Sequence, residues 1–226
     1  MPMLAALLLF GCCRNSGLTQ AEKDLINGSD SLMRVFTVAD SADVDVLRTR
    51  SADFSAADLQ SSEFKALVAK MKYTVQDPSQ DGVGIAAPQV GLNRRMIVVC
   101  RMDLPGEPFV AYANVQIDSL WGETLCGREG CLSVPGLRGN VSRAEFAAVS
   151  YVDPETLCVC RDTVSGYVAR IFQHEVDHLD GILYTDRTGE LWEVEECRRS
   201  FGSPKGSSRS LQSCFRLRGA RAAGPG

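Results

Sequence analysis

Histidine is scarce in this chain of 226 residues, and long apolar runs and an excess of basic charge are lacking as well. The two histidines, His174 and His178, must therefore carry any imidazole chemistry. The apolar run at residues 3–10 is about eight residues long, whereas a membrane-spanning helix needs about 20. The formal net charge of −4 argues against a general nucleic-acid binder, and we expect no DNA partner.

Cysteine is frequent but shows no disulfide pattern. The nine cysteines are an odd number without regular spacing, so they do not indicate a framework of pairs. Cys158-Val159-Cys160 is C-x-C rather than the redox motif C-x-x-C, and we interpret both thiols as structural. We therefore expect a reducing compartment, in which most of the thiols act as small apolar side chains.

A phosphate-binding loop is also lacking. Residues 82–91 are rich in glycine and small side chains, but no G-K-[ST] follows and the spacing is not G-x-G-x-x-G. Small residues do allow the backbone to approach a bound molecule closely. Hydrophobic residues make up 45% of the chain and charged residues 23%, which is typical of a globular domain with a core.

The chain does contain the pattern H-E-x-x-H, in the run His174-Glu175-Val176-Asp177-His178. On a helix, positions i and i+4 lie on one face, so both imidazoles can bind the same metal ion. Glu175 lies between them and can act on a water molecule at that metal. A surface helix with two histidines four apart by chance is the alternative interpretation. The motif by itself leaves the third metal ligand open.

The hydrophobic pattern predicts both helices and strands. Apolar residues recur at helical spacing over about 60–76, which predicts a helix there. Shorter apolar runs predict strands at 96–100, 109–115, 116–120, 147–152 and 157–161. We expect residues 44–50 to be extended and residues 191–199 to form a further short helix. The fold class that we predict is α+β, with antiparallel strands packed around the helix that carries H-E-x-x-H.

Three stretches in this order resemble the peptide deformylase family. They are Gly82-Val83-Gly84-Ile85-Ala86-Ala87-Pro88-Gln89, then Glu129-Gly130-Cys131-Leu132-Ser133, then Gln173-His174-Glu175-Val176-Asp177-His178-Leu179-Asp180-Gly181. The resemblance extends from about Met33 to Arg187, and the order and spacing of the stretches make it specific.

The resemblance implies a role for each matching residue. Cys131, His174 and His178 match the metal ligands, and Glu175 matches the catalytic acid/base. Gln89 and the backbone N–H of Leu132 match the donors that stabilise the oxyanion. Glu129 and Arg143 match an ion pair that supports the cysteine loop, and the candidates to line the methionine pocket are Gly84, Ile85, Gly130, Leu132 and Ile171.

The implied chemistry is hydrolysis of an amide at one divalent metal ion. A thiolate and two imidazoles leave a fourth position open and suit Zn²⁺ or Fe²⁺. The resemblance implies Fe²⁺, with Zn²⁺ or Ni²⁺ able to replace it. Such a metal lowers the pKa of a bound water toward about 7, and the resulting hydroxide attacks the formyl carbon. Glu175 takes the proton and delivers it to the leaving amine, so that formate and a free N-terminus are released.

The predicted function is removal of the formyl group from N-formylmethionine at the start of newly made polypeptides. The partners are then nascent peptides, and by extension the ribosome. One rival is a zincin-type metalloprotease, which needs a third His or Glu ligand downstream of the helix. The chain has no third His, but four downstream acids leave a carboxylate ligand open: Glu190, Glu193, Glu195 and Glu196. A second rival is a non-catalytic, anchored binding protein on the same fold. The intact set of metal ligands argues against the second.

We predict three regions, of which residues 33–195 are the deformylase-like catalytic domain. In the front extension 1–32, Leu9-Phe10-Gly11-Cys12 resembles a lipobox, but the basic stretch of a signal peptide is lacking. The polar residues 14–32 predict a linker. We therefore expect a cytoplasmic protein, and the alternative is an exported lipoprotein anchored to the membrane through a lipid on Cys12. The sequence leaves the start open between Met1 and Met33. Residues 196–226 are predicted to be a basic, disordered tail.

Overall fold

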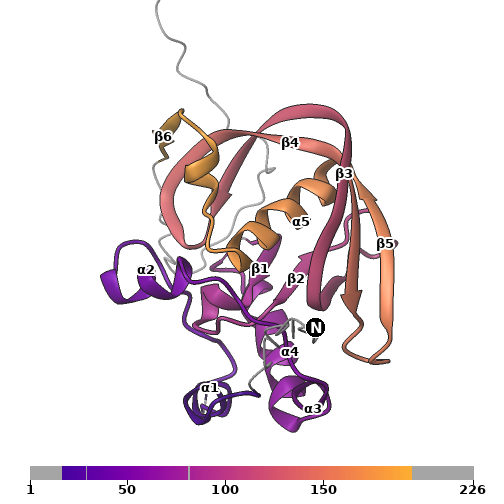
Figure 1. The fold of residues 1–226 in the computed structure, drawn as a ribbon. Helices are drawn as coiled ribbons and strands as arrows, with labels where there is room; N and C mark the ends of the chain where they lie inside the picture. Colours follow the sequence, from indigo (N-terminus) through magenta and orange to yellow (C-terminus); the bar gives the residue numbers. More distant parts are fainter. Residues whose placement is uncertain (1–16, 29, 81, 195–226) are drawn as a thin grey trace, which may run out of the picture. The chain divides into compact units, whose positions relative to one another are not determined.

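The computed structural model describes residues 17–28, 30–80 and 82–194 (Figure 1). Its α-helices are α1 (Gln20–Ile26), α2 (Ser41–Leu47), α3 (Ala56–Leu59), α4 (Ser62–Val75) and α5 (Gly166–Leu179). Its strands are β1 (Gly84–Ala86), β2 (Met96–Cys100), β3 (Phe109–Cys131), β4 (Val134–Val152), β5 (Val159–Ser165) and β6 (Leu191–Glu193). Two 3₁₀ turns, η1 (Ala87–Val90) and η2 (Tyr184–Arg187), complete the described elements.

The described strands form one antiparallel sheet in the order β1-β2-β3-β4-β5, and β6 pairs with β4. The hairpin of β3 and β4 is long and has four register shifts. Such irregularities bend a strand and increase its twist. The hairpin accordingly curves around α5, which lies inside the curve (Figure 1). The predicted α+β fold with a central helix is confirmed.

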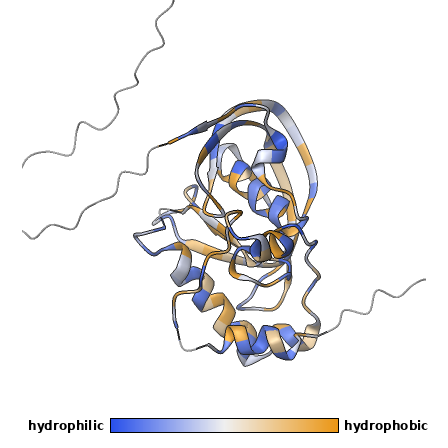
Figure 2. Ribbon diagram, turned by 90° about the vertical axis from the view of Figure 1, so that its left-hand side faces the viewer, coloured by the Kyte–Doolittle hydropathy of each residue, from blue (hydrophilic) through white to orange (hydrophobic). Residues whose placement is uncertain are grey.

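The helix α5 is central because it is buried along most of its length, from Val168 to Leu179. Its apolar residues pack on those of β2, β3 and β4, and the Tyr112 and Phe172 rings meet edge to face with centroids 4.8 Å apart. Figure 2 shows hydrophobic and hydrophilic residues interspersed along the helices. Because α5 is buried over this range, its polar residues are held inside the protein, where close packing fixes their positions.

The local predictions were partly correct. The helix predicted over about 60–76 is confirmed as α4. The extended segment predicted at 44–50 is wrong, because Asp40 caps α2 by accepting a hydrogen bond from the N–H of Ala42. The helix predicted at 191–199 is also wrong in its described part, since Leu191–Glu193 pairs with β4 as β6. A local side-chain cap decides the first case, and long-range pairing with β4 decides the second.

The linker predicted for 14–32 is wrong for the residues that the structure describes. A capping box between Thr19 and Glu22 starts α1, and the Leu18 and Ile26 side chains are buried in the core beside α4. Both carboxylate oxygens of Glu22 accept hydrogen bonds from Arg94, at 2.7 and 2.8 Å. Arg94 is itself buried, so this ion pair fastens α1 to the domain.

We expect Ile26→Ala to lower the free energy of unfolding by about 2–5 kcal/mol, because it leaves a cavity in the core. Ile26 is 0% exposed, whereas its neighbour Leu25 is 42% exposed. Leu25→Ala is therefore the matched control and should cost less than about 1 kcal/mol. Urea unfolding of both variants measures the difference. Equal effects would mean that α1 is not part of the folded domain.

No helix among the described residues is long and apolar enough to cross a membrane. The lipobox-like run at 9–12 and the tail at 196–226 lie outside the described residues. The predictions about them stay predictions.

Candidate metal centre

Three metal-binding side chains meet where β3 ends against α5. Cys131 is the last residue of β3, and His174 and His178 lie one turn apart on α5. One ligand atom of each residue lies within 4.8 Å of the other two. The Cys131 Sγ is 3.1 Å from Nε2 of His178. The structure thus supplies the third ligand that H-E-x-x-H left open, and it is the predicted cysteine.

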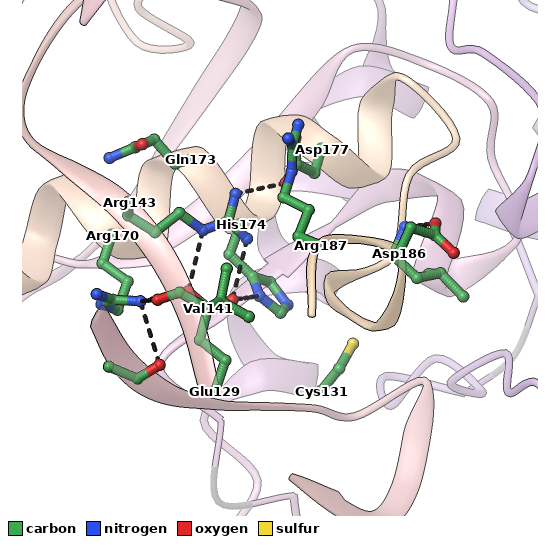
Figure 3. Close-up of polar contacts among 12 residues, drawn as sticks. Glu129, Cys131, Val141, Arg143, Arg170, Gln173, His174, Asp177, Asp186 and Arg187 are labelled. Carbon is green, nitrogen blue, oxygen red and sulfur yellow. Dashed lines mark hydrogen bonds and ion pairs between the residues drawn. The ribbon is translucent and has the colours of Figure 1, made fainter. Parts of the chain in front are cut away.

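The orientation of His174 is set by Glu129. The Nδ1 of His174 lies 2.9 Å from Oε2 of Glu129, a contact that leaves Nε2 for a metal (Figure 3). Burial by itself would raise the pKa of Glu129, but the hydrogen bonds from His174 and Arg143 hold that pKa well below its ordinary value. Glu129 is thus an anion that holds the imidazole in place.

The predicted ion pair between Glu129 and Arg143 is present, and Arg143 donates to both carboxylate oxygens at 3.0 and 2.9 Å. The network extends further than predicted. Asp177 accepts from both Arg143 and Arg187, and Arg170 donates to Glu129 at 2.8 Å (Figure 3). Asp177 could have been found from the sequence, because it lies inside the H-E-x-x-H motif. No sequence motif marks Arg170 or Arg187. Glu129 is thus held by Arg143, Arg170 and His174, and Asp177 in turn holds Arg143.

Glu175 is buried beside the three ligand atoms but is not one of them. Burial raises the pKa of its carboxyl to about 7, against the opposing effect of the two histidines. Its Oε2 has no hydrogen-bond partner among the described residues. A buried carboxylate oxygen without a partner is costly unless a water or ligand satisfies it. This position and pKa suit a group that takes and returns a proton near neutral pH.

Gln89 and Leu132 flank the cysteine from two sides. The Gln89 side chain is buried, accepts a hydrogen bond from the N–H of Ala86, and donates from Nε2 to Ser133 Oγ at 3.1 Å and to Cys131 Sγ at 3.4 Å. Leu132 follows the cysteine directly and lines the same cavity. The structure therefore brings both predicted oxyanion donors to the site. Ser133 belongs to the second stretch, Glu129 to Ser133, but its contact with Gln89 was not predicted.

A cavity of about 420 Å³ opens beside these residues. Of the residues predicted to line it, Gly84, Gly130, Leu132 and Ile171 do so. Ile85 does not, and that prediction is wrong: its side chain is buried in the core cluster that includes α4. Ile85 is 0% exposed, so its side chain is enclosed by the core, whereas the adjacent Gly84 borders the cavity.

Gly84 leaves room that Glu175 needs. A Cβ added at Gly84 would lie 2.5 Å from Oε1 of Glu175 and 2.9 Å from a methyl carbon of Ile171. We expect Gly84→Ala to displace Glu175 and to lower kcat/KM by about 100-fold, because a small misplacement of a reacting group is costly. Gly189→Ala, where a Cβ meets nothing within 4 Å, is the matched control. Unchanged turnover in metal-loaded Gly84→Ala would contradict this role.

The residues present fit a divalent transition metal. A thiolate and two imidazoles are soft-to-intermediate ligands and leave a fourth position open. Burial raises the pKa of the Cys131 thiol, but the imidazoles of His178 and His174 more than reverse this and hold the pKa well below its ordinary value. The thiolate is thus the favoured form, and Cys131, His174 and His178 would hold the ion near the buried carboxyl of Glu175.

A model of the polypeptide deformylase family matches residues 34–193. The chain belongs to this family. Its membership confirms the predicted family and the predicted function and enzyme class, a metal-dependent hydrolase that removes N-formyl groups from nascent peptides.

Relatives of known sequence and structure agree with this membership. The chain is 49% identical to a peptide deformylase of Symbiobacterium thermophilum over 115 residues, which are 51% of this chain and 52% of that protein. It is 39% identical to a peptide deformylase of Leptospira biflexa over 149 residues, covering 63% of this chain and 82% of that protein.

Solved deformylase structures share the fold. The actinonin-bound class I type b peptide deformylase of Acinetobacter baumannii is 37% identical, with a TM-score of 0.62, over 70% of this chain and 99% of that one. The peptide deformylase of Thermotoga maritima is 33% identical, with a TM-score of 0.61 and the same coverage. The family fold and the Cys/His/His site therefore occur together in this chain.

Proposed function

We propose that this family member deformylates N-formylmethionyl nascent chains with Cys131, His174 and His178 as metal ligands and Glu175 as the proton carrier. The observation that carries the proposal is the position of Glu175. Its unpartnered, buried carboxylate oxygen lies next to three converging ligand atoms. A buried carboxyl group beside metal ligands, with a pKa of about 7, is suited to general acid/base catalysis.

In the proposed mechanism, a bound divalent metal supplies a water of lowered pKa, about 7, and an electrophile for the formyl oxygen. Glu175 accepts the proton of the attacking water and later gives it to the leaving amine, so that formate and a free N-terminus are released. Glu129 keeps His174 in the ligand orientation through its 2.9 Å contact with Nδ1.

The oxyanion donors are, in this proposal, Nε2 of Gln89 and the backbone N–H of Leu132. The hydrogen bonds with Ala86 and Ser133 orient the Gln89 amide before substrate binds, and the N–H that now points at Cys131 Sγ would turn to the oxyanion. Gly84, Gly130, Leu132 and Ile171 line the cavity that takes the methionine side chain. Ile171 and Leu132 supply apolar contact, and Gly84 lets the peptide backbone approach closely.

The proposed metal is Fe²⁺, with Zn²⁺ and Ni²⁺ as replacements. The donor set of one thiolate and two imidazoles accommodates all three. Metal analysis of protein purified without oxygen identifies the ion. Formate release from formyl-Met-Ala-Ser by apoprotein reconstituted with each metal then tests the function, and no formate with any metal would refute it.

The zincin-type metalloprotease is the less favoured function. It requires a carboxylate or third histidine at the metal, and the group that fits a metal in the described residues contains Cys131 instead. Of the downstream acids, Glu190 contacts Asn140. Assaying a casein digest alongside the formyl peptide separates the two activities, and it also tests the non-catalytic alternative.

We propose that the protein works in the cytoplasm on chains emerging from the ribosome. A product that starts at Met33 would lack α1, and with it Leu18, Ile26 and the partner of the buried Arg94. These contacts favour a product that keeps residues 17–28. Mass spectrometry of the soluble and detergent fractions decides the start site and tests for a lipid on Cys12.

A further inference from the structure

Two arginines line the cavity beside the metal ligands without serving the metal site. Arg128 lies on β3 and is exposed, and Arg138 lies on β4 and is partly buried. Neither forms an ion pair with a described residue. We call these two residues the arginine rim.

The placement of Arg138 depends on Gly130. A Cβ at Gly130 would lie 2.5 Å from Cδ and Nε of Arg138, so the glycine leaves the arginine side chain room to lie across the residue next to Cys131. Arg128 lies two positions before Gly130 on β3 and lines the same cavity as Arg138. The two cationic side chains therefore flank the same end of the cavity.

The acids of the cavity do not neutralise the arginine rim. Glu129 is occupied by His174, Arg143 and Arg170. Glu175 faces the metal ligands, and its Oε2 has no partner among the described residues. The arginine rim thus remains a local positive region on a chain whose net charge is −4. Such a region attracts anionic groups of a substrate most strongly at low salt.

A formyl peptide must pass this region. Its formyl carbon has to lie at Cys131, His174 and His178, and each following residue of an extended chain advances by about 3.3 Å. Since Arg138 covers the residue next to Cys131, the first residues after formylmethionine come within reach of a guanidinium group. We propose, on the basis of the proposed function, that Arg128 and Arg138 make this deformylase prefer nascent chains with an acidic residue directly after formylmethionine.

The test compares the amidated peptides formyl-Met-Glu-Ser-NH₂, formyl-Met-Gln-Ser-NH₂ and formyl-Met-Lys-Ser-NH₂, which lack a terminal carboxylate. At low salt we expect kcat/KM for the Glu peptide to exceed that for the Lys peptide by about three- to tenfold, the range of two partly exposed ion pairs. The difference between the peptides should lie in KM. It should shrink in 0.5 M salt, because the electrostatic screening length falls to about 4 Å.

Arg128→Glu and Arg138→Gln should each reduce the Glu/Lys ratio, and Arg128→Glu should bring it to one or below. Arg161→Glu makes the same charge change on β5 at an exposed position that does not line the cavity, so its ratio should equal that of the unchanged protein. A ratio near one in the unchanged protein would overturn the proposal. An unaltered ratio in Arg128→Glu and Arg138→Gln would overturn it too.

Failure of the proposed function gives a different result, which is no formate from any of the three peptides. Calorimetry with the product peptides Met-Glu-Ser-NH₂ and Met-Lys-Ser-NH₂ then measures the charge preference without turnover. Tighter binding of the Glu peptide that is lost in Arg128→Glu supports the arginine rim. Equal binding of both peptides refutes it.

Discussion

Glu175→Gln should keep one metal ion per chain and lose most of its turnover, by about 100-fold or more, because the amide cannot accept the proton from water. The glutamine has nearly the same shape as the glutamate, so the close approach to Gly84 is kept. Metal content by elemental analysis and formate release by the same preparation measure the two effects together.

The control for this variant is Glu155→Gln, which removes one carboxylate from the exposed turn after β4. It should leave both metal content and formate release unchanged. Full activity of metal-loaded Glu175→Gln would rule out Glu175 as the proton carrier. Loss of the metal would instead make Glu175 a ligand, contrary to the group of three atoms that converge in the structure.

Cys131→Ala should weaken metal binding by more than about 100-fold, since loss of a group that merely orients a ligand already costs 10–100-fold. Its sulfur lies 3.1 Å from Nε2 of His178, within the group of ligand atoms. Competition with a chelator measures the affinity, and formate release should fall with the metal content.

Cys160→Ala is the matched control, because this thiol lies on β5 away from the histidines and contacts the carbonyl of Cys158. It should bind metal as the unchanged protein does. Equal affinity in Cys131→Ala would remove the cysteine from the metal site. The metalloprotease alternative, with a carboxylate as third ligand, would then regain support.

Much of the metal site was predictable because its signals are local. His174, Glu175 and His178 lie within five residues on one helix, and helical spacing alone places both imidazoles on one face. Their order after the Gly84 and Cys131 stretches indicated the family, the third ligand and the reaction. The helix α4 was predictable for the same reason, since its apolar residues repeat at helical spacing.

The sequence alone did not show which face of a short segment is buried, because that depends on what packs against it. Ile85 lies beside Gly84 in the motif, yet its side chain is enclosed by the core near α4 and does not line the cavity. The segment before Met33 has the polar composition of a linker. Two of its apolar side chains, Leu18 and Ile26, nevertheless fill the core, and Glu22 meets the buried Arg94.

By itself, the sequence determined the helix that carries the histidines, the identity of the ligands and the reaction class. The tertiary structure decided the contacts that join distant segments. Glu129 meets His174 across 45 positions, and Arg138 of β4 lies over Gly130 of β3. Such contacts depend on strand register and on the bends of the long hairpin. Local residue patterns carry no information about them, because they arise only when the segments pack together.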